Sequence, residues 1–215
     1  MAESPLTLSV DSFWISPYAF SCYVALKEKG LPFEVRAVSL PDKEHHRPEY
    51  QKQSMTGRIP MLQHGDFTLS ESSAIVEYLD DAFPGTPRAV PASVRDRARA
   101  RQIMAWVRSD LMPIREERST TTMFYERATK PLSPAAQDAA RRLMAFAQAV
   151  VPEGRTSLFG VPWTVADADL AFMIQRLNLN GFELPPAVRR FVDTQWQRPS
   201  VQEWVNHKRL PYRPY

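Results

Sequence analysis

The sequence predicts an α/β N-terminal domain followed by an all-α C-terminal domain. The first part of the chain alternates short β-type runs with helices that are apolar on one face, whereas residues beyond 94 contain no run typical of a strand. Between them, PGTPRAVPAS (84–93) holds three prolines and one glycine, a composition typical of a linker. We therefore expect an α/β domain over 1–83, a linker over 84–93 and a helical domain over 94–215.

The first element is a β-type run, LTLSV, at residues 6–10. A helix over 17–29 follows, because apolar side chains recur there at the spacing of one helical face: Ala19, Cys22, Tyr23 and Leu26. Gly30 ends this helix, and FEVRAVSL (33–40) returns to β-type residues. One strand, one helix and one strand predict a βαβ unit with a parallel pair.

The next segment, 41–58, is polar and predicts a loop with a short irregular helix. IPMLQHGDFTLS (59–70) then predicts two strands around a hairpin turn at Gly65–Asp66, and ESSAIVEYLDDAF (71–83) predicts a helix. A parallel pair combined with a hairpin is the pattern of a thioredoxin-like domain.

The sequence after the linker, from residue 94 onward, predicts helices only. A helical stripe runs through 94–118, with a kink expected at Pro113, and an alanine-rich helix covers 134–150. TVADADLAFMIQRLNLNG predicts a buried helix opened by Thr164 and Asp167, which together resemble a capping box and are assigned no chemistry. Two more helices are expected over 185–194 and 199–208, and the tail RLPYRPY is too rich in proline to continue the last one.

Composition narrows the class of protein. The chain has 215 residues, 44% hydrophobic and 24% charged, as in ordinary globular proteins. No apolar run approaches the ~18 residues of a membrane span, MAESPLTLSV lacks the features of a signal peptide, and one cysteine cannot form an internal disulfide. We expect a cytoplasmic protein with no membrane association. A net charge of +3 suits an anionic small molecule as well as a nucleic acid.

Several kinds of site are disfavoured. Cys22 falls on the apolar face of its helix and the chain has no C-x-x-C, so disulfide exchange through a protein thiol is not expected. The four histidines do not form a ligand set, so no metal is expected. Four arginines alternate with other residues: Arg95, Arg97, Arg99 and Arg101. On a helix this spacing distributes them around the axis instead of along one face. We therefore expect a solvated or subunit-facing surface and not a nucleic-acid site.

Ser16, in the sequence SPY, allows two interpretations. Serine is a favoured N-cap, and Pro17 suits the first helical position, where no N–H is needed. The same geometry can also bind an anion, because a helix N-terminus combines free N–H groups with a positive dipole. The residues around Ser16 alone favour the cap.

Four motifs in order carry a resemblance to a known family: SPY, GRIP (57–60), ESSAI (71–75) and TVADADL (164–170). Over residues 6–208 the sequence resembles the glutathione S-transferases. The run RARQIMAWVRSDLMPIREER, with SPY and ESSAI, looks particularly like the bacterial YfcF-type branch.

The resemblance implies that glutathione binds along the edge of the first domain, with its sulfur at the helix that Ser16 opens. Lowering a thiol pKa of ~8.5 by about two units requires ~2.7 kcal/mol. A helix N-terminus contributes roughly 0.3–1 kcal/mol, up to ~2, and a hydroxyl hydrogen bond to an anion about 1.5–3 kcal/mol. Ser16 would then be the catalytic residue, as a hydrogen-bond donor to the glutathione sulfur and not as a nucleophile.

Further glutathione-binding residues follow from the same resemblance. Glu71 suits the ammonium of the γ-glutamyl group and Ser72 its carboxylate, although both also suit an ordinary helix start. The family's proline at Pro60 is cis, which frees the Ile59 main chain to pair with the cysteinyl backbone. Three residues are candidates for the glycine carboxylate or, alternatively, solvated loop charges: Arg58, Lys43 and His45.

The resemblance also implies an acceptor pocket and a homodimer. Five residues are candidates for the electrophile pocket, with core or interface packing as the alternative for each: Trp14, Met104, Arg108, Met112 and Arg115. We expect a glutathione transferase that attacks hydrophobic electrophiles or organic hydroperoxides. The alternatives are a non-catalytic glutathione-binding or regulatory protein, another glutathione-dependent enzyme (isomerase, dehalogenase or etherase), and a nucleic-acid module, which would bind in a steeply salt-dependent manner.

Overall fold

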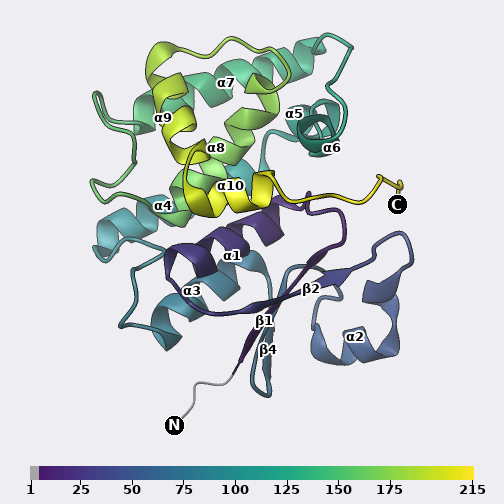
Figure 1. The fold of residues 1–215 in the computed structure, drawn as a ribbon. Helices are drawn as coiled ribbons and strands as arrows, with labels where there is room; N and C mark the ends of the chain where they lie inside the picture. The colour runs from purple at the N-terminus through teal and green to yellow at the C-terminus, as the bar shows by residue number, and fades with distance from the viewer. Residues whose placement is uncertain (1–4) are drawn as a thin grey trace. The chain divides into compact units, whose positions relative to one another are not determined.

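The computed structural model describes residues 5–215, so residues 1–4 of the expected first domain lie outside the described part (Figure 1). The chain forms two compact units. One contains the residues up to Ala89 together with Glu203–Tyr215, and the other contains Val90–Gln202. The break at Ala89 falls inside the expected linker. The final segment, which the sequence interpretation placed in the helical domain, groups with the first unit.

A four-stranded sheet with the order β2-β1-β3-β4 forms the centre of the first unit. Its strands are β1 (Leu6–Asp11), β2 (Glu34–Val38), β3 (Met61–His64) and β4 (Phe67–Ser70). β1 pairs parallel with β2 and antiparallel with β3, and β3 pairs antiparallel with β4. This order confirms the predicted thioredoxin-like domain. β1 lies between two other strands, which explains why nearly all of it is buried.

Two helices of the first unit, α1 (Pro17–Glu28) and α3 (Ser72–Ala82), pack against each other beside the sheet (Figure 1). Cys22 lies within α1 and is fully buried, in agreement with a core role. The polar segment after β2 contains a 3-10 helix, η1 (Glu44–His46), and the short α2 (Pro48–Gln53). Tyr50 of α2 packs with Val38 and Met61 in a small hydrophobic cluster.

The second unit is helical. Its elements are α4 (Val94–Ser109), α5 (Met112–Glu117), α6 (Thr121–Phe124), α7 (Pro134–Val150), α8 (Val165–Asn178), α9 (Pro186–Trp196) and the beginning of α10 (Pro199–Val205). α8 is buried from Val165 to Leu177. Its capping box is present as predicted: Asp167 accepts the Thr164 N–H at 2.8 Å and the Thr164 hydroxyl at 2.7 Å. Among the described residues, no helix combines the length and the apolar character that a bilayer span requires.

The helix expected over 94–118 is two helices, not one kinked helix. α4 ends at Ser109, and Leu111 adopts a left-handed conformation with φ of 62°. Pro113 explains the break, since its ring would clash with the carbonyl four residues earlier and it offers no N–H. The Asp110 carboxylate accepts the Leu111 N–H at 2.6 Å and the Trp106 indole N–H at 3.1 Å, which stabilises the break. The short α6 was not predicted.

Candidate functional site

The strand register brings the predicted glutathione-binding residues to one edge of the sheet. β1 and β2 run parallel and end together, because Asp11 pairs with Val38. Met61, at the start of β3, pairs with Ser9 of β1 and with Ser70 at the end of β4. Every predicted residue of this group lies in a segment that leaves or enters the sheet at this edge: Ser16, Lys43, His45, Arg58, Ile59, Pro60, Glu71 and Ser72.

Ser16 caps α1 and keeps a hydroxyl proton available. Its Oγ accepts the backbone N–H of Ala19 at 3.3 Å, and its main chain is extended, as at an ordinary N-cap. Ser16 is half-buried, and no hydrogen bond in the described part of the chain uses its hydroxyl proton. A hydroxyl can accept and donate at once, so the cap and a donor to an anion are compatible in this residue.

The sequence interpretation missed Asp11, which precedes this cap. Asp11 is fully buried at the end of β1. Its carboxylate accepts the N–H of Ile15 at 3.0 Å and the N–H of Ser16 at 2.9 Å, and its carbonyl accepts the N–H of Trp14 at 3.0 Å. An acidic residue at the end of a strand, just before a capping serine, is the sequence signal that could have found it.

Glu71 and Ser72 lie at the start of α3. Glu71 is exposed and has an unusual backbone, with φ of 73°, whereas Ser72 is buried. The Cys22 thiol donates to the Ser72 carbonyl at 3.7 Å, which links the first turns of α3 to α1. In the described part of the chain, neither the Glu71 carboxylate nor the Ser72 hydroxyl has a hydrogen-bond or ion-pair partner.

The Ile59–Pro60 peptide bond is cis, as the resemblance implied. The segment before it is held through the Arg58 carbonyl, which accepts the Tyr50 hydroxyl at 2.8 Å and the Ser54 hydroxyl at 3.4 Å. Ser54 also shares a hydrogen bond of 2.9 Å with Ser70 at the end of β4. No hydrogen bond within residues 5–215 involves the main chain of Ile59, so its N–H and C=O are available to pair with a peptide.

The three candidates for the glycine carboxylate differ in their surroundings. Lys43 and Arg58 are exposed, and neither side chain has an ion-pair partner among the described residues. The His45 ring is half-buried, and its Nδ1 has no hydrogen-bond partner in the described part of the chain. Burial, the neighbouring His46 and the charge of Arg58 lower the pKa of His45, which favours a neutral ring.

Trp14, a candidate for the electrophile pocket, belongs to an aromatic cluster of the first unit. Its ring stacks on His207 with centroids 3.7 Å apart and contacts Trp204 at 4.8 Å and Tyr23 at 5.4 Å. Only 8% of Trp14 is exposed, so packing accounts for most of its surface.

The other four pocket candidates lie near the junction of α4 and α5. Met104 is buried, whereas 46% of Met112 is exposed. The Arg108 guanidinium donates from Nε to Asp169 at 2.8 Å and thereby ties α4 to α8. The Arg115 side chain donates to the Arg108 carbonyl. The two arginines therefore have structural partners within the helical unit.

The C-terminal segment packs on the loop between β1 and α1. Arg209 donates to the Trp14 carbonyl at 3.1 Å, and Phe13 contacts Tyr212 with ring centroids 5.3 Å apart. Arg213 forms an exposed ion pair with Asp42 at 2.8 Å. The sequence interpretation did not foresee these contacts, because no local pattern reports a pairing between residues so distant in the chain.

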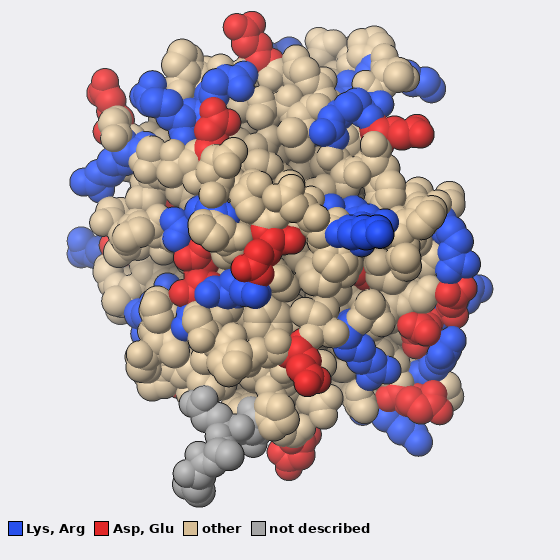
Figure 2. Space-filling view, in the orientation of Figure 1, with Lys and Arg blue, Asp and Glu red and all other residues tan. Residues whose placement is uncertain are grey.

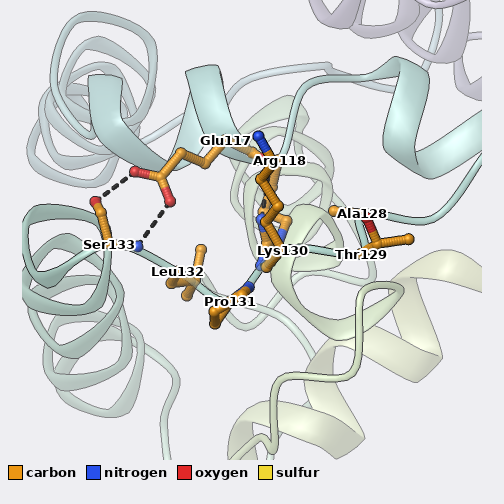
Figure 3. A pocket seen from close by; sticks show the side chains of 8 residues that line it. All are labelled: Glu117, Arg118, Ala128, Thr129, Lys130, Pro131, Leu132 and Ser133. Carbon is orange, nitrogen blue, oxygen red and sulfur yellow. Dashed lines mark hydrogen bonds between the residues drawn. The ribbon is translucent and has the colours of Figure 1, made fainter.

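A separate pocket of about 560 Å³ lies in the helical unit between α5 and α7 (Figure 3). Glu117 and Lys130 line it, and the Glu117 carboxylate accepts the Ser133 N–H at 2.9 Å. None of the residues predicted as binding or catalytic lines this pocket.

Two further features of the described part of the chain are its charged side chains and its potential metal ligands. On the face drawn in Figure 2, acidic and basic side chains are interspersed. Among residues 5–215, no three His, Cys, Asp or Glu side chains are grouped so as to hold a metal ion.

Models of known protein families match both parts of the chain. Residues 12–87 match "Glutathione S-transferase, N-terminal domain" and residues 93–208 match "Glutathione S-transferase, C-terminal domain". A crystal structure of a glutathione transferase homolog from Burkholderia gl BGR1, with bound glutathione, is 43% identical. The alignment with this structure covers 94% of our chain and 96% of the homolog's chain, with a TM-score of 0.75.

Curated proteins align over shorter stretches. A probable glutathione S-transferase GSTU1 from Oryza sativa subsp. japonica is 42% identical over 42% of this chain and 38% of its own length. A maleylpyruvate isomerase from Ralstonia sp is 35% identical over 52% of each chain. The alignments thus span about half or less of these relatives.

Proposed function

Because the chain belongs to the glutathione S-transferase family, we propose that it binds glutathione at the described sheet edge and activates its thiol. The observation that carries this proposal is the Ser16 hydroxyl. It sits at the N-terminus of a 12-residue helix, accepts one backbone N–H and retains its proton for an anion. A thiolate there gains both a hydrogen bond and the favourable end of the helix dipole.

The groups around Ser16 fit the other parts of glutathione. The unpaired main chain of Ile59 suits the cysteinyl backbone, as an additional strand partner would. Glu71 suits the γ-glutamyl ammonium, and Ser72 at the start of α3 suits its carboxylate. His45, Arg58 and Lys43 follow on the same edge, and their side chains suit the glycine carboxylate.

We propose that the glutathione thiolate attacks a hydrophobic electrophile, forming a thioether as the leaving group departs. Alternatively it attacks the terminal oxygen of an organic hydroperoxide, which releases the alcohol and gives glutathione sulfenic acid; a second glutathione then converts this to glutathione disulfide and water. The exposed Met112 is the first of the pocket candidates to test, ahead of the buried Met104 and Trp14 and the partnered Arg108 and Arg115. The composition supports a cytoplasmic location, the sequence motifs support the YfcF-type branch, and the family resemblance supports a homodimer.

A glutathione-dependent isomerase is the second candidate. The alignment with a maleylpyruvate isomerase at 35% identity favours it. Both reactions require a bound glutathione thiolate, so they share the first unit and differ in the acceptor. A panel of electrophiles, hydroperoxides and cis-unsaturated maleyl compounds, each assayed with and without glutathione, separates the two candidates.

Calorimetric titration with glutathione tests the binding site itself. Ser72→Ala and Glu71→Gln should weaken glutathione binding about tenfold each, the loss expected for one charge-assisted hydrogen bond. Ser73→Ala, one residue along the same helix on an exposed position, is the matched control and should bind as the wild type does. Binding without turnover on any acceptor would favour a regulatory protein, and no binding at all would overturn the proposal.

A further inference from the structure

Three consecutive backbone N–H groups before α1 donate to one residue. Trp14 donates to the Asp11 carbonyl, and Ile15 and Ser16 donate to the two oxygens of the Asp11 carboxylate. This bonding determines the course of the loop, in which Trp14 adopts a left-handed backbone with φ of 54°. Such a backbone is costly for a tryptophan and persists only where surrounding contacts hold it.

We propose that Asp11 is a positioning residue for the Ser16 hydroxyl. Rotation about the Ser16 backbone would move the hydroxyl, and the hydrogen bond from the Ser16 N–H to Asp11 restricts that rotation. The inference rests on the proposed role of Ser16 in activating glutathione and extends it to the residue that fixes its geometry.

The surroundings of Asp11 support a dedicated role. Its side chain is fully buried, where a carboxylate is costly unless it is hydrogen-bonded. Burial raises the pKa of Asp11, and the N–H groups of Ile15 and Ser16 act in the opposite direction. A neutral polar residue could not satisfy both N–H groups with two acceptor oxygens, which explains the choice of an acid at this position.

Asp11→Asn is the direct variant. Asparagine keeps the shape but offers one acceptor oxygen, and its amide N–H₂ opposes the second backbone N–H. The hydroxyl should then be misplaced, and a misplacement of about 1 Å costs on the order of 10²-fold in rate. We expect kcat to fall by about 10- to 100-fold and the KM for glutathione to change by less than about threefold, because other residues hold the tripeptide.

Asp167→Asn is the matched control. Asp167 is also a fully buried carboxylate, and it accepts the N–H groups of Leu158 and Thr164, but in the helical unit. If Asp11 acts on structure alone, the two variants should behave alike, with lower stability and unchanged kinetics per folded molecule. That outcome overturns the proposal.

A double-mutant cycle with Ser16→Ala separates this inference from the proposed function. If Asp11 acts through Ser16, Asp11→Asn should lower kcat in the wild type and have little further effect in Ser16→Ala. Additive losses overturn the positioning role while leaving the role of Ser16 intact. Wild-type kinetics in Ser16→Ala alone would overturn the proposed function, and this inference with it.

If Asp11→Asn does not fold, amide hydrogen exchange measured on the wild-type protein tests the proposal instead. The amides of Ile15 and Ser16 lie outside the helix and the strand, and Ser16 is only half-buried, so slow exchange of the Ser16 amide requires its bond to Asp11. Protection comparable to that of α1 supports the positioning role. Exchange as fast as in an exposed loop overturns it.

Discussion

Lys29 and Asp80 form an ion pair inside the first unit, with Nζ and Oδ1 2.8 Å apart and each side chain 1% exposed. The Lys29 ammonium also donates to the Pro87 carbonyl at 3.1 Å, and Asp80 Oδ1 accepts the Ala89 N–H at 2.8 Å. The pair therefore connects the end of α1, the helix α3 and the start of the linker.

We expect Lys29→Met to lower the free energy of unfolding by about 3 kcal/mol, because the buried Asp80 carboxylate then keeps only the more exposed Arg88, 3.6 Å away, as its cationic partner. Urea unfolding measures the loss. The double variant Lys29→Met/Asp80→Leu should recover much of it, since both charges are then removed. A single variant as stable as the wild type would show that the pair contributes little.

The capping box of α8 should give the protein a pH-dependent stability. Burial raises the pKa of Asp167 from 3.8 to about 6, although the bonds from Thr164 and Leu158 lower it. A folded-state pKa above the unfolded value means that the folded state binds more protons between about pH 4 and pH 6, so this contribution to stability falls as the pH rises through that window.

Compared with Asp167→Asn, the wild type should gain up to about 2 kcal/mol of stability when the pH is lowered from 7 to 4.5. At pH 7, Asp167→Asn should lower the free energy of unfolding by about 1–2 kcal/mol, because the variant weakens the helix cap. Unfolding at both pH values measures the difference. An equal difference at the two pH values would show that Asp167 titrates as an ordinary carboxyl.

Arg209 should stabilise the loop that leads to Ser16. Its guanidinium donates to the Trp14 carbonyl at 3.1 Å and to the Trp204 carbonyl at 2.9 Å. We expect Arg209→Ala to cost about 2 kcal/mol of unfolding free energy, the order of one hydrogen bond to a charged group. Arg190→Ala, at an exposed position of α9, should cost less than about 0.5 kcal/mol. Equal effects of the two variants would contradict a role for Arg209 in holding the loop.

Tyr50 should affect glutathione binding without touching it. Its hydroxyl donates to the Arg58 carbonyl at 2.8 Å, next to Ile59, and burial raises its pKa to about 12, so the proton stays in place. Tyr50→Phe keeps the packing and removes that hydrogen bond, which should lower the free energy of unfolding by about 1 kcal/mol. The KM for glutathione should rise while kcat changes little. Steady-state kinetics with varied glutathione tests this, and an unchanged KM would contradict it.

Local sequence signals predicted most of the fold. Gly65–Asp66 indicated the hairpin turn, and Gly30 indicated the end of α1. Thr164 and Asp167 indicated the cap of α8. Each of these features depends on residues that are close together in the chain. The break between α4 and α5 was expected only as a kink. The reason is that the Asp110 side chain stabilises the separate helices through bonds that spacing alone does not reveal.

The candidate site was predicted only in part. Ser16, Glu71 and Ser72 were proposed as site residues because helix starts have a composition of their own and the family resemblance implied roles for them. Asp11 was missed, since an acid at the end of a strand has many ordinary uses. The contacts of Arg209 and Tyr212 with the loop before α1 depend on tertiary structure, which no window along the sequence reports.

The central claim is that the Ser16 hydroxyl and the start of α1 together ionise the glutathione thiol. Thiolate absorbance of protein-bound glutathione, followed as a function of pH, measures the thiol pKa directly. We expect a wild-type value about two units below the free thiol, a value at least one unit higher in Ser16→Ala, and recovery in Ser16→Thr, which keeps the hydroxyl. The same thiol pKa in the wild type and in Ser16→Ala would contradict the claim.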